Sequence, residues 1–80
     1  MKVRITVMPR EGILDPQGKA IASALGRLGW GTVHEVRAGR VFRAEIDGTD
    51  AAAVREAAVK MAGQLLANPV TEDFEVEVEG

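Results

Sequence analysis

The sequence predicts an α+β fold, a two-layer sandwich in which two helices lie on one face of an antiparallel sheet. Two observations lead to this prediction. Segments at both ends of the chain and in its middle alternate apolar and polar residues, as half-buried strands do. Between them, two segments repeat apolar residues with helical spacing. The expected order is therefore strand, helix, long strand, helix, strand.

The first strand is predicted over residues 2–8. Val3, Ile5 and Val7 occupy alternate positions, and the polar residues Lys2, Arg4 and Thr6 alternate with them. This period of two is typical of a strand with one buried face. Pro9 ends the strand because proline cannot donate a hydrogen bond to a neighbouring strand.

The first helix is predicted to begin at Asp15 and Pro16. The Asp15 carboxylate can accept hydrogen bonds from the free N–H groups of the first turn, and proline is well tolerated at the first helical position. Gly29 suits the left-handed position that ends many helices, and Trp30 can then fold back onto Leu25. The expected apolar stripe consists of Ala20, Ile21, Ala24, Leu25 and Leu28.

Residues 32–47 are predicted to be extended, and their apolar residues have even numbers on both sides of Gly39. A two-residue turn there would pair residues of opposite parity, such as Arg37 with Arg40, and would interrupt the apolar face. The pattern favours one long strand, bent or bulged near Gly39. A hairpin with a three-residue turn also keeps the parity and is the alternative. The apolar residues are Val36, Ala38, Phe42, Ala44 and Ile46.

The second helix is predicted to start after Gly48, with Asp50 as its cap, and to stop at Asn68 because the residue before Pro69 avoids helical geometry. Glu56 and Lys60 form an i,i+4 pair on its outer side. Its expected buried stripe is Val54, Ala57, Ala58, Met61, Leu65 and Leu66.

The last strand is predicted over residues 72–79, where Phe74, Val76 and Val78 alternate with glutamates. The whole chain, residues 1–80, is expected to form a single domain, since its length suits one core and not two. The connections between the predicted elements resemble those of ferredoxin-like folds.

The composition excludes several classes of function. The chain has no Cys and a single His, so disulfides and the usual soft-metal sites are not expected. Ten basic and twelve acidic residues give a formal net charge of -2, which gives no general attraction to nucleic acid or to an anionic membrane. No apolar run follows the first residues, so a signal peptide is not expected and a cytoplasmic location is.

A catalytic site is not predicted. His34 has no second His, Ser or Cys placed to form a triad or a ligand set. Glu75, Glu77 and Glu79 lie in a line along one strand, which indicates a solvated face, or one that pairs with Lys2 and Arg4 if the first and last strands are neighbours. The sequence therefore predicts no catalytic, cofactor-binding or metal-binding residue in this chain.

Gly18 stands out within the first turn of the predicted helix. Glycine there costs up to about 1 kcal/mol relative to alanine. The simpler interpretation is a glycine tolerated near a helix end, and the alternative is that another group approaches the backbone closely. A second distinctive segment, residues 65–74, contains the helix stop at Asn68-Pro69.

These two segments resemble the PurS family, the small subunit of phosphoribosylformylglycinamidine synthase. Residues 14–20 (LDPQGKA) resemble the most distinctive motif of that family, and residues 65–69 (LLANP) with 72–74 (EDF) resemble its C-terminal signature. Residues 28–30 (LGW) and 36–40 (VRAGR) match its middle part in order and spacing. The resemblance covers nearly the whole chain and is weakest over residues 41–46.

The resemblance implies a part in purine biosynthesis, in the step that converts formylglycinamide ribonucleotide to its amidine with glutamine and ATP. A glutaminase subunit would supply ammonia, and a large synthetase subunit would use ATP and magnesium. The small subunit would bind neither cofactor. It would associate with itself, hold the two larger subunits together in the cytoplasm and assist ammonia transfer, without contacting nucleic acid or a membrane.

We expect Asp15, Gln17, Gly18 and Lys19, together with Asn68 and Pro69, to lie on surfaces that meet the larger subunits. Arg37, Gly39 and Arg40 are expected on the face used for self-association. The alternative function is an ACT-like regulatory domain, which would bind a small molecule at a dimer interface.

Overall fold

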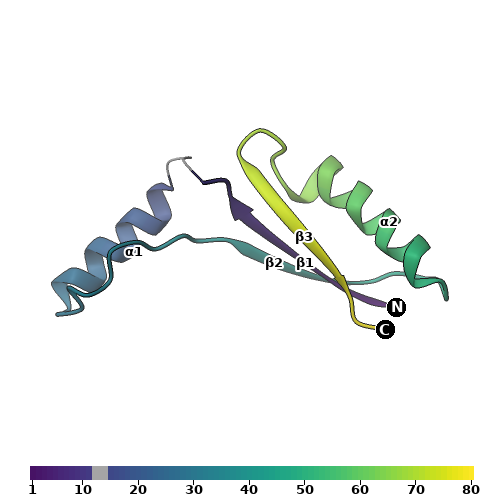
Figure 1. The fold of residues 1–80 in the computed structure, drawn as a ribbon, viewed down its shortest axis with the longest axis horizontal. Coiled ribbons are helices and arrows are strands. Elements are labelled where there is room, and N and C mark those ends of the chain that lie inside the picture. The colour runs from purple at the N-terminus through teal and green to yellow at the C-terminus, as the bar shows by residue number, and fades with distance from the viewer. Residues whose placement is uncertain (12–14) are drawn as a thin grey trace.

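The computed structural model describes residues 1–11 and 15–80. Its elements are β1 (Lys2–Pro9), α1 (Pro16–Arg27), β2 (Arg40–Glu45), α2 (Ala51–Met61), the π-helical turn η1 (Ala62–Leu66) and β3 (Glu72–Val78). Within this part of the chain the strands form one antiparallel sheet in the order β2-β1-β3 (Figure 1). The predicted order of elements and the antiparallel sheet are confirmed. The start of the motif at Leu14 lies outside the described residues.

The core is centred on β1, the middle strand. Val3, Ile5 and Val7 are fully buried, as the alternation predicted, and they face Val54 and Ala58 of α2. A helix laid over one face of the sheet explains why only one parity of each strand is apolar.

The buried side of α2 differs from the predicted stripe. Met61 and Leu65 are exposed, Leu65 by 84%, and Ala62 is buried instead. The exposure of Leu65 follows from η1, where the N–H of Ala67 bonds to the carbonyl of Ala62, five residues back. Because a π-helical turn holds more residues than an α-helical one, Leu65 turns away from the sheet and Leu66 packs against the core instead.

Both ends of α1 are as predicted. Asp15 is the cap and accepts from the N–H of Gly18, and Pro16 follows it. At the other end Gly29 has a φ of 101°, and the N–H of Trp30 bonds to the carbonyl of Leu25 at 2.9 Å. This is the hydrogen bond that a helix ending in a left-handed glycine makes.

The position of α1 corrects the prediction that two helices share one face of the sheet. Figure 1 shows α2 over the sheet and α1 beyond its end, beside the extended segment that leads into β2. The reason is that residues 33–39 run straight on from β2 and carry α1 away. We call residues 15–38 the arm; it runs from the cap of α1 to Ala38 in this extended segment.

The predicted long strand is paired over its second half alone. β2 begins at Arg40, opposite Val7, and β1 ends two residues further on at Pro9, so most of the extended segment before β2 has no neighbour in β1. Gly39 does not have a positive φ, so the chain lacks the left-handed residue that a three-residue hairpin turn uses. The structure therefore has the continuous path and not the hairpin.

Candidate interaction surfaces

The arm is held together at its base by Asp15. One carboxylate oxygen accepts from the N–H of Gly18 at 3.0 Å, and the other accepts from the N–H of Ala38 at 2.8 Å. These two backbone hydrogen bonds lower the pKa of Asp15, Gly18 contributing most. The carboxylate thus links the start of α1 to the strand-like segment that returns alongside it.

Gly18 is buried where α1 meets that segment. A Cβ at this position would collide with the carbonyl oxygen of Val36. Of the two interpretations of this glycine, the structure therefore has the close approach, and the approaching group belongs to the same chain. Gln17 and Lys19, on either side of Gly18, are exposed.

Arg37 and Gly39 join the arm to the sheet. The Arg37 guanidinium donates to the carbonyl of Pro9, the last residue of β1. A Cβ at Gly39 would meet the carbonyl oxygen of Val7 at 2.5 Å and the sulfur of Met8. Only glycine lets the chain pass this close to β1, so Gly39 supports the straight path of the arm.

Arg40 fixes the loop that leads from η1 to β3. Its guanidinium donates to both carboxylate oxygens of Glu72, at 2.8 and 2.9 Å, and to the carbonyl of Leu66 at 3.0 Å. Glu72 also accepts from the N–H of Asn68 at 2.8 Å. The Arg40 side chain and then the Asn68 N–H lower the pKa of Glu72, and the same ion pair raises the pKa of Arg40.

Arg10 holds the other side of this loop. It donates to the carbonyls of Pro69 and Val70, at 2.8 and 3.3 Å, and to the Asp73 carboxylate at 3.0 Å. The Asn68 side chain accepts from the N–H of Val70 at 2.9 Å, which makes a tight turn. We call residues 67–71 the tip loop; a shallow hollow of about 330 Å³ lies beside it, lined partly by Pro69 and Phe74.

The sequence-predicted residues therefore gather at one end of the sheet. Pro9 lies opposite Glu72, and Val7 lies opposite Arg40. The base of the arm and the tip loop are joined through these pairs. Arg10 and Glu72 were not predicted as site residues, because the sequence shows Arg10 as a loop residue and Glu72 as the start of a strand; only their positions beside proline-containing turns hinted at a role.

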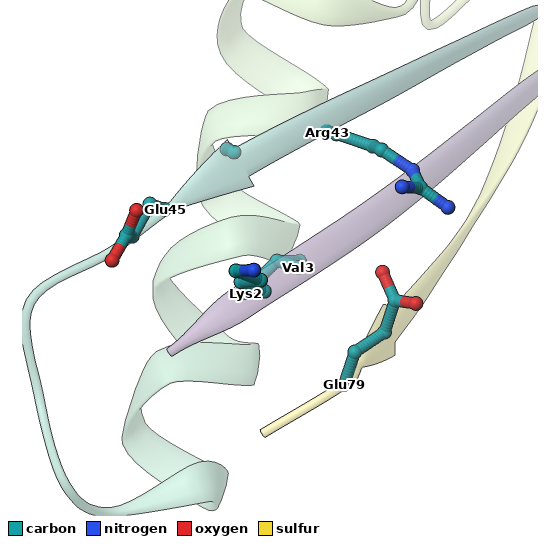
Figure 2. A pocket seen from close by; sticks show the side chains of 6 residues that line it. Lys2, Val3, Arg43, Glu45 and Glu79 are labelled. Atoms are coloured by element: carbon teal, nitrogen blue, oxygen red, sulfur yellow. The ribbon is translucent and has the colours of Figure 1, made fainter.

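The outer face of the sheet carries mostly charged side chains. Arg4 pairs with Glu77 across β1 and β3, as predicted, and this ion pair raises the pKa of Arg4. Figure 2 shows Lys2, Arg43 and Glu79 around a shallow, open pocket of about 550 Å³ on this face. Lys2 lies on β1, Arg43 on β2, and Glu79 directly after β3, and Arg43 and Glu79 point toward each other.

Among the described residues, no group of three or more His, Cys, Asp or Glu side chains is arranged to hold a metal ion. In that same part of the chain, no helix is long and apolar enough to cross a membrane. His34, the single histidine, is exposed.

Comparison with known proteins gives a consistent picture. Residues 2–80 match the family model "PurS: Phosphoribosylformylglycinamidine (FGAM) synthase". The PurS subunit of phosphoribosylformylglycinamidine synthase from Mycobacterium leprae is 49% identical over 73 residues, covering 90% of this chain and 87% of that protein. The PurS subunit of phosphoribosylformylglycinamidine synthase from Methanocaldococcus jannaschii is 35% identical over 78 residues, covering 98% of this chain and 94% of that protein.

Solved structures agree in fold. The PurS of Bacillus subtilis superposes with a TM-score of 0.86 at 36% identity, covering 99% of this chain and 98% of that one. A chain of the PurLQS structure from Thermotoga maritima superposes with a TM-score of 0.85 at 30% identity, covering 95% of this chain and 93% of that one. From its sequence and its fold, over nearly its full length, this chain belongs to the PurS family of phosphoribosylformylglycinamidine synthase subunits.

Proposed function

We propose that this chain is the small, non-catalytic subunit of a phosphoribosylformylglycinamidine synthase and joins the glutaminase subunit to the synthetase subunit. The observation that carries the proposal is the structural match to a chain of the Thermotoga maritima PurLQS structure, which covers 95% of this chain. The reaction converts formylglycinamide ribonucleotide to its amidine with glutamine and ATP. In this proposal the larger subunits bind ATP and magnesium, and the small subunit assists ammonia transfer by keeping them together.

Two exposed parts of the molecule are proposed as contacts for the larger subunits. The first is the start of α1, where Gln17 and Lys19 are exposed beside the buried Gly18. The second is the tip loop, where Asn68 and Pro69 are exposed and Val70 is 74% exposed. Asp15 and Gly18 support the first surface from within, so substitutions at these two residues would act through its shape.

Self-association is the second part of the proposal. The radius of gyration is 15.9 Å, whereas a compact chain of this length has about 12 Å. The accessible surface is 5807 Å², and a compact monomer of this mass exposes about 4,700 Å². This excess of about 1,100 Å² includes apolar side chains of α1, and a second copy would cover it.

Co-purification tests the adaptor role. The tagged chain is mixed with the glutaminase and synthetase subunits of the same organism in the presence of glutamine and MgATP, and we expect all three proteins to elute as one complex. Lys19→Glu should weaken retention of one larger subunit, whereas Lys60→Glu, at an exposed position on α2, should not. Failure of both larger subunits to bind the wild-type chain would refute the adaptor function.

A further inference from the structure

We propose that the hollow beside the tip loop receives an apolar side chain of the synthetase subunit. The hollow has a volume of about 330 Å³ and lies between η1, the tip loop and β3, where Gly63, Pro69 and Phe74 line it. The inference rests on the adaptor role proposed above and names the partner that binds at this place.

Gly63 occupies a position at which this chain does not itself need glycine. It is the second residue of η1 and its φ is not positive, so other residues could adopt its backbone conformation. An added Cβ would meet nothing within 4 Å, whereas at Gly18 and Gly39 carbonyl groups of the chain fill that space. Because glycine is less stable in a helix than alanine, its presence here suits close approach by another molecule.

The surface around the hollow is uncharged. Residues 61–71, which form the end of α2, η1 and the tip loop, contain no Asp, Glu, Lys or Arg, although these residue types make up 28% of the whole chain. Within this segment Val70 is 74% exposed, and Pro69 is exposed as well. Depletion of charge around exposed apolar groups is the composition typical of the centre of a protein–protein interface.

The charged side chains that line the hollow are already paired. Arg10 contacts Asp73 at 3.0 Å, and Glu72 contacts Arg40 at 2.8 Å. A charged group of a partner would therefore lose its hydration at this place without gaining a counter-charge. The complementary occupant is an uncharged, apolar side chain.

The tip loop has its conformation fixed before a partner arrives. The Arg10 guanidinium donates to the carbonyls of Pro69 and Val70, and the N–H of Asn68 donates to the Glu72 carboxylate. The Val70 side chain is thereby held outward. Ordering a loop opposes binding, so a loop that is already held in place presents an apolar anchor at a lower cost in entropy.

The hollow lies apart from the surface proposed for self-association. Figure 1 shows the tip loop joining α2 to β3, whereas α1 lies beside the segment that leads into β2. In the sheet, β1 separates β2 from β3. A second copy that covers the apolar side chains of α1 therefore leaves the hollow available to a larger subunit.

Of the two larger subunits, the synthetase is the one whose contact can be permanent. Glutamine hydrolysed before the synthetase holds its substrates would release ammonia to water, so attachment of the glutaminase is expected to depend on substrates. Apolar interfaces are typical of permanent association, and polar ones of conditional association. The uncharged, preformed hollow therefore fits the synthetase.

Binding of the synthetase alone, without glutaminase, glutamine or MgATP, tests this assignment. The tagged chain is immobilised, and the dissociation constant of the synthetase of the same organism is measured. Gly63→Leu fills the hollow, and we expect the dissociation constant to rise by about tenfold or more. Gln64→Leu adds the same side chain at the next position, which is exposed and does not line the hollow, and should change the constant by less than about twofold.

The stability of the isolated chain separates a lost contact from a damaged fold. Leucine is a better helix former than glycine, so the melting temperature of Gly63→Leu should equal or exceed that of the wild type. Val70→Asp places a charge on the uncharged surface outside any helix, and it should raise the dissociation constant as Gly63→Leu does, whereas Val70→Leu should not. These loop variants test the surface even if Gly63→Leu folds poorly.

Three results would overturn the inference in distinguishable ways. Wild-type affinity for the synthetase in both Gly63→Leu and Val70→Asp would place this subunit on another surface. Weaker binding of the glutaminase with unchanged binding of the synthetase would show that the glutaminase occupies the hollow. A wild-type chain that binds neither larger subunit, with or without substrates, would refute the adaptor function itself.

Discussion

The Asp15 carboxylate accepts a 2.8 Å hydrogen bond from the N–H of Ala38, 23 residues further along the chain. Its second oxygen caps α1 through the N–H of Gly18. A single side chain therefore sets both the start of the helix and the path of the segment that returns from it. The arm should consequently respond as one unit when this carboxylate is altered.

Asp15→Ala should loosen the whole arm. The substitution removes the cap of α1 and the acceptor for Ala38 together, so both ends of the arm lose support. We expect faster amide hydrogen exchange at Gly18 and Ala38 and a lower helical signal in circular dichroism. Asp50→Ala is the matched control, because Asp50 caps α2 through the N–H of Ala52 alone. Unchanged protection at Ala38 in Asp15→Ala would contradict this role.

Acidification should release the arm before the core unfolds. The pKa of Asp15 is lower in the folded chain than the value of about 3.9 typical of an unfolded one. Its contribution to stability is therefore complete above about pH 4 and is lost as the pH falls through the folded pKa. Helical signal and Ala38 exchange followed from pH 6 to pH 2 should show this loss. In Asp15→Asn the corresponding transition should be absent.

Gly18→Ala and Gly26→Ala should change stability in opposite directions. A Cβ at Gly18 collides with the Val36 carbonyl, whereas a Cβ at Gly26 meets nothing within 4 Å. We expect Gly18→Ala to cost about 1–3 kcal/mol and Gly26→Ala to stabilise the helix by up to about 1 kcal/mol. Thermal unfolding at equal protein concentration measures both. Equal melting temperatures for the two variants would show that the Gly18 contact is not tight.

Local patterns in the sequence predicted most of this fold. The alternation of Val3, Ile5 and Val7 located the buried strand, and Asp15, Pro16 and Gly29 bounded α1 correctly, because caps and alternation depend on neighbouring residues only. The exposure of Leu65 was missed, since a π-helical turn leaves no distinct sign in the order of apolar residues.

The arrangement of α1 was not accessible to the same reasoning. An apolar stripe predicts that one face of a helix is buried, but it does not show whether the surface that buries it belongs to the same chain. Gly18 suggested a close approach of backbone as one interpretation, whereas Gly39 suggested a bend or a turn. The groups that come close to them, from Val36 and Val7, could be identified only from the fold. The ion pair of Arg40 with Glu72 likewise joins residues 32 apart, which no local pattern connects.

Glu72→Gln should loosen the tip loop without unfolding the sheet. The amide keeps one acceptor oxygen, so it cannot accept from both Arg40 nitrogens and the Asn68 N–H as the carboxylate does. We expect faster exchange of the Asn68 amide and weaker retention of one larger subunit. Glu75→Gln is the control, since this exposed carboxylate lies on the same strand, β3, and not at the tip loop. Normal Asn68 protection in Glu72→Gln would exclude the proposed support.

Arg55→Leu should leave the β3 edge of the sheet open to pairing with a strand of another molecule. The guanidinium donates to the outward carbonyl of Val76, and its loss leaves that carbonyl free to accept from another strand. Removing a hydrogen bond from a charged donor should destabilise the chain by about 1.5–3 kcal/mol. We also expect assemblies larger than the wild-type species in light scattering at high concentration. Lys60→Leu adds the same apolar side chain to α2 but removes only an exposed pair with Glu56, at 3.8 Å, and should leave particle size unchanged. If the particle size increases equally in both variants, the association is caused by the added surface hydrophobicity and not by the unprotected edge.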